Sequence, residues 1–262
     1  MTSTVTRVRD FAPTDYEAWV AGSNRCYPDY PWTVKEMRHQ EDAFDRSRFF
    51  KARFVAEEDG ALVGALEIAH RPSRFHPDRY WWDLWVVPDR RRRGHGSALY
   101  DTGVRLLRER NALAAGTGVK ESMSDGLGFA RKHGWVEVKR DWESRLRVEA
   151  FDFAKFASAD ERVAKDGIRI TTLADELAKD PNAIRTAFEL VDVVRYDVPG
   201  TDPATPTTFE DWNRSHGLES PSFMADAFFR VGELKVVERG RHQPLLGLAL
   251  RGERGLGVGV IA

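Results

Sequence analysis

An apolar strand pattern that runs directly into a turn of arginine and glycine constrains this chain most. Residues 80–88, YWWDLWVVP, are rich in aromatic and β-branched side chains and end at a proline, which is typical of a strand. The stretch DRRRRGHGSALY follows at 89–100, and apolar residues at helical spacing continue to residue 111. A strand, a glycine-containing turn and a helix in direct succession predict a layered α/β domain.

The rest of the first half supplies the other elements of such a domain. Strand patterns occupy residues 4–11, 50–58, 61–71, 113–121 and 135–148, and helical patterns occupy 14–26, 32–44 and 124–134. The two strands that flank Asp59 and Gly60 are predicted to form a hairpin. The expected order is β-α-α-β-β-β-α-β-α-β, with one or two strands in the last segment, and it indicates an α/β (α+β) fold.

The turn itself has the chemistry of an anion site. A helix begins with unpaired backbone N–H groups and the positive end of its dipole, and phosphates bind at such ends. Gly94 and Gly96 would let a ligand approach the backbone closely. The alternative is a solvated run of arginines that caps a helix. A dinucleotide-binding turn is excluded because Leu99 stands where its third glycine belongs. A Walker-type phosphate loop is excluded because Gly-Lys-Ser/Thr is absent.

The segment VVPDRRRRGHGSAL resembles the acetyl-CoA pyrophosphate loop of the GNAT N-acetyltransferase superfamily. Arg91, Gly94 and Gly96 fill the defining Arg/Gln-x-x-Gly-x-Gly/Ala positions, and FARKHGWVEV resembles the end of the family's domain. The resemblance covers residues 5–149. It implies a GNAT-like mixed central sheet flanked by helices. It also implies transfer of an acetyl group from acetyl-CoA, the co-substrate, to an amine of a small molecule or peptide, by direct attack in a ternary complex.

The resemblance further implies which residues bind the co-substrate. The strand would pair with the pantetheine arm, a backbone N–H near Val86 or Val87 would meet the thioester oxygen, and the turn would hold the pyrophosphate. The implied binding residues are Leu84, Trp85, Val86, Val87, Arg91, Arg92, Arg93, Gly94, His95, Gly96 and Ser97. Trp81, Trp82 and Trp85 are expected to be core or cleft walls, and His70 and His95 to be surface residues. No metal is implied.

Two carboxylates are candidates for the catalytic base that an attacking amine requires. Asp83 lies on the strand before the turn, and Glu67 lies on the second hairpin strand; each could instead be an outward-facing charge. The asparagine and the tyrosine acid that many relatives carry are replaced by Met123 and Ala130. Substitution by Tyr80 or Tyr100 stays open, although the spacing of neither tyrosine favours it. A non-catalytic acyl-CoA sensor or structural module with this fold therefore remains an alternative.

The second half predicts a weaker, partial copy of the first. We expect a GNAT domain at residues 1–150, a linker or connecting helix at 151–167, and a partial second GNAT-like domain at 168–262. Residues 236–250 resemble the first hairpin, with Gly247 in the place of Gly64, but chance similarity of two hairpins is a rival explanation. The sequence ends before a second loop, so a truncated domain is a further option. Residues 251–262 are expected to be a flexible tail.

The composition limits the class of partner and the compartment. Forty basic residues against forty-one acidic ones give a net charge of -1, which argues against nucleic-acid binding. Cys26 is the only cysteine, so no intrachain disulfide forms, and a small core residue is the simplest role for it. No apolar run is long enough to cross a bilayer, and no secretory signal is present. These features predict a cytoplasmic protein and leave a homodimer open.

Overall fold

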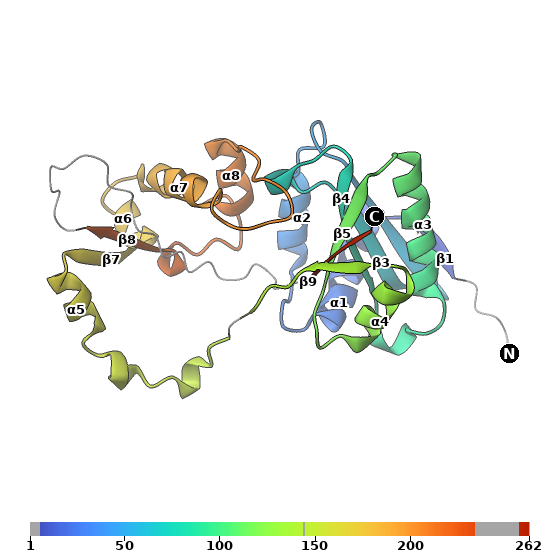
Figure 1. The fold of residues 1–262 in the computed structure, drawn as a ribbon, viewed down its shortest axis with the longest axis horizontal. Coiled ribbons are helices and arrows are strands. Elements are labelled where there is room, and N and C mark those ends of the chain that lie inside the picture. Colours follow the sequence, from blue (N-terminus) through green and yellow to red (C-terminus); the bar gives the residue numbers. More distant parts are fainter. Residues whose placement is uncertain (1–5, 144, 234–256, 262) are drawn as a thin grey trace. The chain divides into compact units, whose positions relative to one another are not determined.

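The computed structural model describes residues 6–143, 145–233 and 257–261, and the chain forms two compact units. The described part of the first unit comprises residues 6–141, Gly200–Thr207 and 257–261 (Figure 1). The described part of the second unit comprises the remaining residues between 142 and 233. The domain boundaries at residues 150 and 168 stay a prediction.

A seven-stranded mixed sheet forms the centre of the first unit, in the order β1-β2-β3-β4-β5-β9-β6. Its neighbours pair antiparallel, except that β4 and β5 run parallel. The strands are β1 (Arg7–Asp10), β2 (Lys51–Glu58), β3 (Ala61–Ala69), β4 (Arg79–Val86), β5 (Ala114–Val119), β6 (Val136–Lys139) and β9 (Gly257–Ile261). The mixed sheet that the sequence predicts is therefore confirmed.

Helices cover both faces of this sheet (Figure 1). The helices are α1 (Tyr16–Cys26), α2 (Val34–Asp42), α3 (His95–Glu109) and α4 (Ser124–Lys132). Trp85 of β4 packs edge-on against Trp19 of α1, with ring centroids 5.7 Å apart. Trp82 of β4 lies against Gly103 of α3 on the opposite face. Side chains alternate between faces along a strand, so one aromatic-rich strand contributes to both halves of the core.

The C-terminal residues 257–261 correct the sequence prediction of a flexible tail. They form β9, which pairs antiparallel with β5 on one side and with β6 on the other. The stretch GVGVI alternates glycine with valine, and its β-branched residues favour an extended backbone. The glycine content of this stretch suggested a tail. Its partners, β5 and β6, are distant in the sequence, so the neighbouring residues do not indicate the pairing. The segment 135–148 contributes only one described strand, β6.

The second unit contains its own small core. Its elements are α5 (Ala159–Lys165), β7 (Ile168–Thr172), α6 (Leu173–Leu177), α7 (Ala183–Val194), α8 (Phe209–His216) and β8 (Phe229–Glu233). Leu173, Ile184, Ala187, Trp212 and Phe228 are buried together. A second GNAT copy is not confirmed. The predicted second hairpin at 236–250, with Gly247, lies outside the described residues and stays a prediction.

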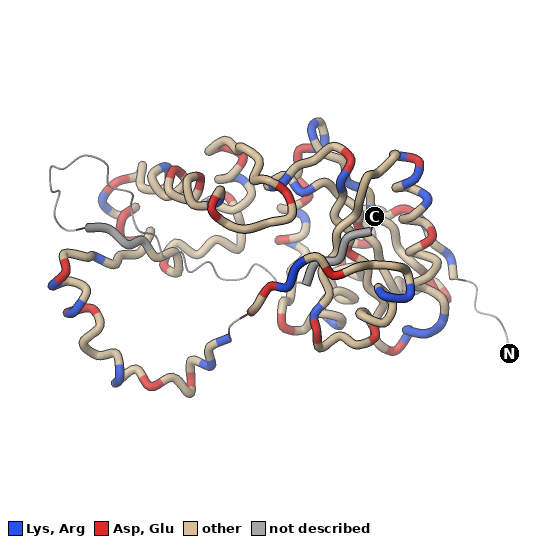
Figure 2. Tube along the Cα trace, in the orientation of Figure 1, with Lys and Arg blue, Asp and Glu red and all other residues tan. Residues whose placement is uncertain are grey.

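Lysine and arginine alternate with aspartate and glutamate along both units, and the run of arginines marks the turn that enters α3 (Figure 2). Among the helices of the described residues, none is long and apolar enough to cross a membrane. The same residues contain no cluster of three or more His, Cys, Asp and Glu side chains that could hold a metal ion.

Candidate functional site: the β4–α3 turn and the β4–β5 opening

The turn between β4 and α3 presents a row of backbone amides. Arg92 and Gly94 both have left-handed backbones, with φ of 63° and 94°, and α3 begins at His95. The first helical hydrogen bond of α3 runs from Ala98 N to Gly94 O, at 3.0 Å. Within the described residues, the N–H groups of residues 92–97 therefore have no backbone acceptor. Left-handed residues interspersed in a turn direct such amides into a concave, anion-binding surface.

The arginine side chains around the turn mostly stabilise it from within. Arg90 Nε and Arg93 Nη1 each lie 3.3 Å from a carboxylate oxygen of Glu58, whose side chain is only 3% exposed. Arg91 Nε donates to the carbonyl oxygen of Val86 at 3.1 Å. Arg92 is exposed and forms no ion pair with any described residue. The row of amides and the Arg92 side chain are thus the parts of the turn left for a ligand.

The two histidines expected at the surface are buried, and that prediction was wrong. His95 is 1% exposed; its Nδ1 lies 2.8 Å from Thr6 Oγ1 and its Nε2 lies 3.7 Å from Glu58. Its side chain links the first turn of α3 to the residue before β1 and to the end of β2 rather than facing a ligand. His70 accepts a hydrogen bond from Phe50 N and contacts Pro77 O, each at 3.0 Å. Burial lowers the pKa of His70 below its ordinary value of 6.5.

Strands β4 and β5 pair along only part of their length. Residues 79–81 of β4 are in register with 114–116 of β5, and the pairing stops at Trp81 and Gly116. The N–H of Val87 donates to Val63 O of β3 at 2.9 Å. Backbone groups point alternately to the two sides of a strand, so the N–H groups of Leu84 and Val86 face β5. The end of β4 nearest the turn therefore has an edge that β5 does not pair.

The two candidate bases lie opposite each other in the sheet, with Glu67 of β3 in register with Asp83 of β4. Glu67 is held by Arg53, whose Nε lies 2.5 Å from its Oε2. Arg53 is buried and also pairs with Glu41 of α2 at 2.8 Å. The carboxylate of Glu67 is thus fixed against Arg53. Asp83 lies on the partly unpaired strand itself.

The sequence profile described as "Acetyltransferase (GNAT) family" matches residues 16–135. This part of the chain is a GNAT acetyltransferase domain. Among curated proteins, none matches the chain.

Solved structures similar to this chain match over about half its length. The ribosomal-protein-S18-alanine N-acetyltransferase from Escherichia coli is 18% identical, with a TM-score of 0.44, over 54% of this chain and 85% of its own. Ard1 from Thermoplasma volcanium is 23% identical, with a TM-score of 0.43, over 51% of this chain and 84% of its own. A GNAT family acetyltransferase from Brucella melitensis in complex with acetyl-CoA is 20% identical, with a TM-score of 0.40, over 54% of this chain and 93% of its own.

The two tyrosines that could replace the family's absent acid, Tyr80 and Tyr100, both make local hydrogen bonds. Tyr80 donates to Pro77 O at 3.2 Å and accepts from Arg110 Nε at 3.0 Å, at the start of β4. Tyr100 of α3 donates to His133 O at 3.4 Å, and burial raises its pKa. A raised pKa keeps the phenol protonated, but both hydroxyls already make local hydrogen bonds.

Sequence reasoning missed three residues that shape the GNAT site. Glu58 holds two arginines of the turn from the far end of β2. Arg53 pairs with Glu67, and the thiol of Cys26 donates to Val86 O at 3.4 Å. Burial raises the pKa of that thiol. Of these residues, only Glu58 could have been noticed in the sequence, as a carboxylate beside a hairpin turn. The contacts of Arg53 and Cys26 depend on how distant segments pack together.

Proposed function

We propose that the protein is an N-acetyltransferase that uses acetyl-CoA and an amine acceptor, either a small molecule or a peptide, in one ternary complex. The observation that carries this proposal is the row of six backbone amides at 92–97, which have no backbone acceptor among the described residues, next to a strand edge that β5 leaves open. Amides at a helix start suit a pyrophosphate, and an open strand edge suits the amide-bearing pantetheine arm. The GNAT family match supports the same reading.

The backbone of β4 supports a specific oxyanion donor. Val87 is excluded because its N–H already donates to Val63 O. Val86 N–H faces the unpaired side of β4 and would donate to the thioester oxygen as negative charge develops there. A single donor of this kind typically contributes about 3 kcal/mol to the lowering of the barrier.

We assign the base role to Asp83 and not to Glu67. Asp83 lies on β4, two residues past the point where the β4–β5 pairing ends, whereas Glu67 is one strand away and bound to Arg53. Asp83 would accept a proton from the amine as the C–N bond forms at the thioester carbon, and the C–S bond would then break to release CoA as its thiolate. A thiol of ordinary pKa, about 8.5, leaves tolerably without a dedicated acid, so Ala130 at the family's tyrosine position does not forbid turnover.

Binding and turnover are tested separately. Calorimetry with acetyl-CoA is expected to give one site per chain, and thiol release is then measured with polyamines, aminoglycosides, amino acids and peptide N-termini. Asp83→Asn should lower kcat about 100-fold or more while leaving acetyl-CoA affinity unchanged. The matched variant Glu67→Gln should retain most of the turnover, because Glu67 is not the base.

The second candidate function is the acyl-CoA sensor, which the absence of the family's asparagine and tyrosine at Met123 and Ala130 favours. Acetyl-CoA binding with no turnover on any amine class would support the sensor. No binding at all would contradict both functions. A cytoplasmic location and a homodimer stay predictions.

A further inference from the structure

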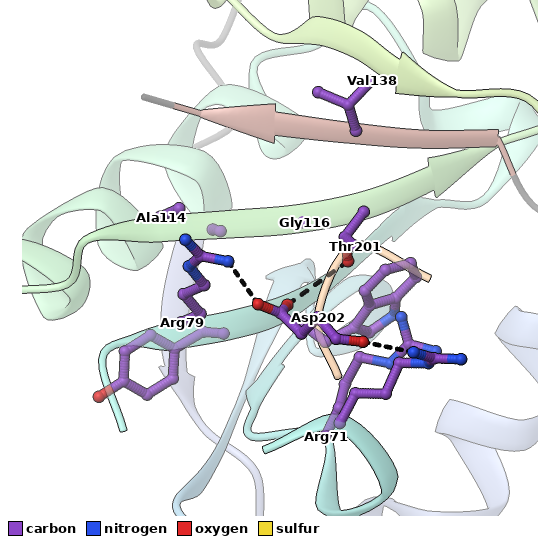
Figure 3. A pocket seen from close by; sticks show the side chains of 11 residues that line it. Arg71, Arg79, Ala114, Gly116, Val138, Thr201 and Asp202 are labelled. Atoms are coloured by element: carbon purple, nitrogen blue, oxygen red, sulfur yellow. Dashed lines mark hydrogen bonds and ion pairs between the residues drawn. The ribbon is translucent and has the colours of Figure 1, made fainter. Parts of the chain in front are cut away.

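A cavity of about 300 Å³ lies at the start of β4 and β5, on the first unit. Three arginines, Arg71, Arg74 and Arg79, contribute to its lining together with Trp81, Gly116 and Asp202 (Figure 3). We refer to it as the arginine pocket. Among the described residues that line it, Asp202 is the only acidic one. Three positive charges against one negative charge give the pocket a net positive lining.

A carboxylate of the chain itself occupies the arginine pocket. Asp202 Oδ1 pairs with Arg79, and the carbonyl oxygen of Asp202 accepts a hydrogen bond from Arg74. Figure 3 shows Asp202 pointing toward Arg79 from the neighbouring chain segment. The Asp202 side chain is 16% exposed, so it is largely withdrawn from water. The pocket can therefore hold a carboxylate in charge-assisted hydrogen bonds.

Besides the contacts of Asp202, two hydrogen bonds among the described residues join the segment that carries it to the first unit. Thr205 N donates to Ser73 O at 2.9 Å, and Phe75 N donates to Thr205 Oγ1 at 2.7 Å. The segment Gly200–Thr207 belongs to the first unit but is joined at both ends to residues of the second. It contains no helix or strand. A short irregular segment of this kind can leave without unfolding the sheet.

The arginine pocket adjoins the place where acetyl transfer is proposed. Trp81 and Gly116 both line the pocket, and they are also the last paired residues of β4 and β5. Arg79, Trp81 and Asp83 lie on the same face of β4, because side chains two residues apart share a face. The Cα atoms of Arg79 and Asp83, the proposed base, are four residues apart along β4 and therefore about 13 Å apart. An acceptor of modest length can span that distance.

The guanidinium group of Arg79 retains capacity for a further anionic group. Arg79 Nε is buried and has no hydrogen-bond acceptor among the described residues. Arg71 lies over the ring of Trp81, with its Cζ 4.6 Å from the ring centroid, which holds that guanidinium at the pocket wall. A planar guanidinium matches a carboxylate or a phosphate with two parallel hydrogen bonds.

We propose that the arginine pocket binds an anionic group of the amine acceptor, a carboxylate or a phosphate, and that Asp202 occupies it until the acceptor displaces it. This inference rests on the proposed function, since it assigns the acceptor class of the same site. The amine of the acceptor then lies toward Asp83 and its anionic group lies against Arg79. The protein would acetylate amines that carry a negative charge at their other end.

The test compares acceptors that differ only at the far end. Thiol release is measured with ω-aminooctanoate, with ω-aminooctyl phosphate and with the uncharged ω-aminooctanol. We expect kcat/KM for one of the anions to exceed that for the alcohol about tenfold or more. The preferred anion identifies the carboxylate or the phosphate. Arg79→Gln should abolish the preference, whereas Arg105→Gln, which removes an exposed charge on α3, should keep it.

The displacement by the acceptor is tested with Asp202→Ala. Loss of the internal carboxylate should lower KM for the preferred anion and leave KM for ω-aminooctanol unchanged. An anion preference that survives in Arg79→Gln, or no preference in the wild type, would overturn the proposal. Thermal unfolding of each variant shows whether the fold is retained.

A binding measurement separates this proposal from the proposed function. Glutarate and inorganic phosphate are titrated by calorimetry in excess CoA, so that the β4–α3 turn is already filled. Asp202→Ala should bind the anion more tightly than the wild type, and Arg79→Gln should not bind it. Anion binding without any acetyl transfer would uphold the pocket and contradict the proposed function. Acetyl transfer without anion binding would uphold the proposed function and contradict the proposal for the arginine pocket.

Discussion

Gly94 is the residue on which the shape of the β4–α3 turn most depends. Its φ of 94° is unfavourable for any residue with a Cβ, and a Cβ built there meets nothing within 4 Å. Gly94→Ala should therefore fold, with a loss of about 1–2 kcal/mol from the free energy of unfolding. The added methyl group would stand where a pyrophosphate approaches, so acetyl-CoA affinity should fall about tenfold or more.

Gly134 supplies the matched control, because its φ is 79° and a Cβ there also meets nothing within 4 Å. Gly134→Ala should cost similar stability without weakening acetyl-CoA binding. Denaturant unfolding and calorimetry measure the two effects. Equal loss of affinity in both variants would show that general strain, rather than the turn, controls binding.

His70 makes the stability of the first unit depend on pH. Burial lowers its pKa below 6.5, so the unfolded chain binds a proton that the folded chain does not. The stabilisation is complete above the unfolded pKa and is lost as the pH falls below it. Burial also lowers the pKa of His133, which adds to the effect in the same direction.

We expect the midpoint of denaturant unfolding to fall between about pH 8 and about pH 5, and to fall less steeply in His70→Gln. His133 is unchanged in that variant and supplies the remaining slope. A variant with the same pH slope as the wild type would contradict the role of His70.

At the scale of elements, α3 is held close to the sheet by a contact that only glycine permits. A Cβ on Gly103 would overlap the ring of Trp82 and meet Leu66 Cδ2 at 2.9 Å. Gly103→Ala should therefore displace α3, lower the free energy of unfolding by about 1–3 kcal/mol and weaken acetyl-CoA binding through the shifted turn. Thermal unfolding and calorimetry measure both effects.

The control is Gly128→Ala in α4, where a Cβ meets nothing within 4 Å. It should raise stability by about 0.5–1 kcal/mol, because alanine favours a helix over glycine. Destabilisation of both variants to the same extent would refute the close packing of α3 as the cause.

Local sequence patterns predicted the strands and helices of the first unit well. The alternation in 50–71, and the strand, turn and helix of 80–111, depend on neighbouring residues and are visible in the chain. Glu58 was missed and His95 was misjudged because their partners lie more than thirty residues away in the sequence. Residues 257–261 were misjudged because the register of β9 depends on β5 and β6, which are more than a hundred residues away.

At the scale of the whole molecule, the chain end completes the sheet of the GNAT unit. Val260 is in register with Gly116 of β5 and with Val136 of β6, so β9 is a central strand. Proline cannot donate a ladder hydrogen bond and is excluded from central strands. Val260→Pro should detach β9 and expose two strand edges.

Lower thermal stability and concentration-dependent association in size exclusion are the expected results for Val260→Pro. Val260→Thr, which keeps the backbone donor and the β-branched shape, should remain close to the wild type. A monomeric Val260→Pro variant with unchanged thermal stability would contradict the place of β9 in the sheet.

The most direct test of acetyl-CoA binding is amide hydrogen exchange with and without acetyl-CoA. The backbone N–H groups of residues 92–97 have no backbone acceptor within the described residues, and that of Val86 faces the unpaired side of β4. The proposed binding mode predicts that acetyl-CoA slows exchange at 92–97 and at Val86, while Val87, already bonded to Val63, changes little. Unchanged exchange at 92–97, or protection confined to other segments, would contradict it.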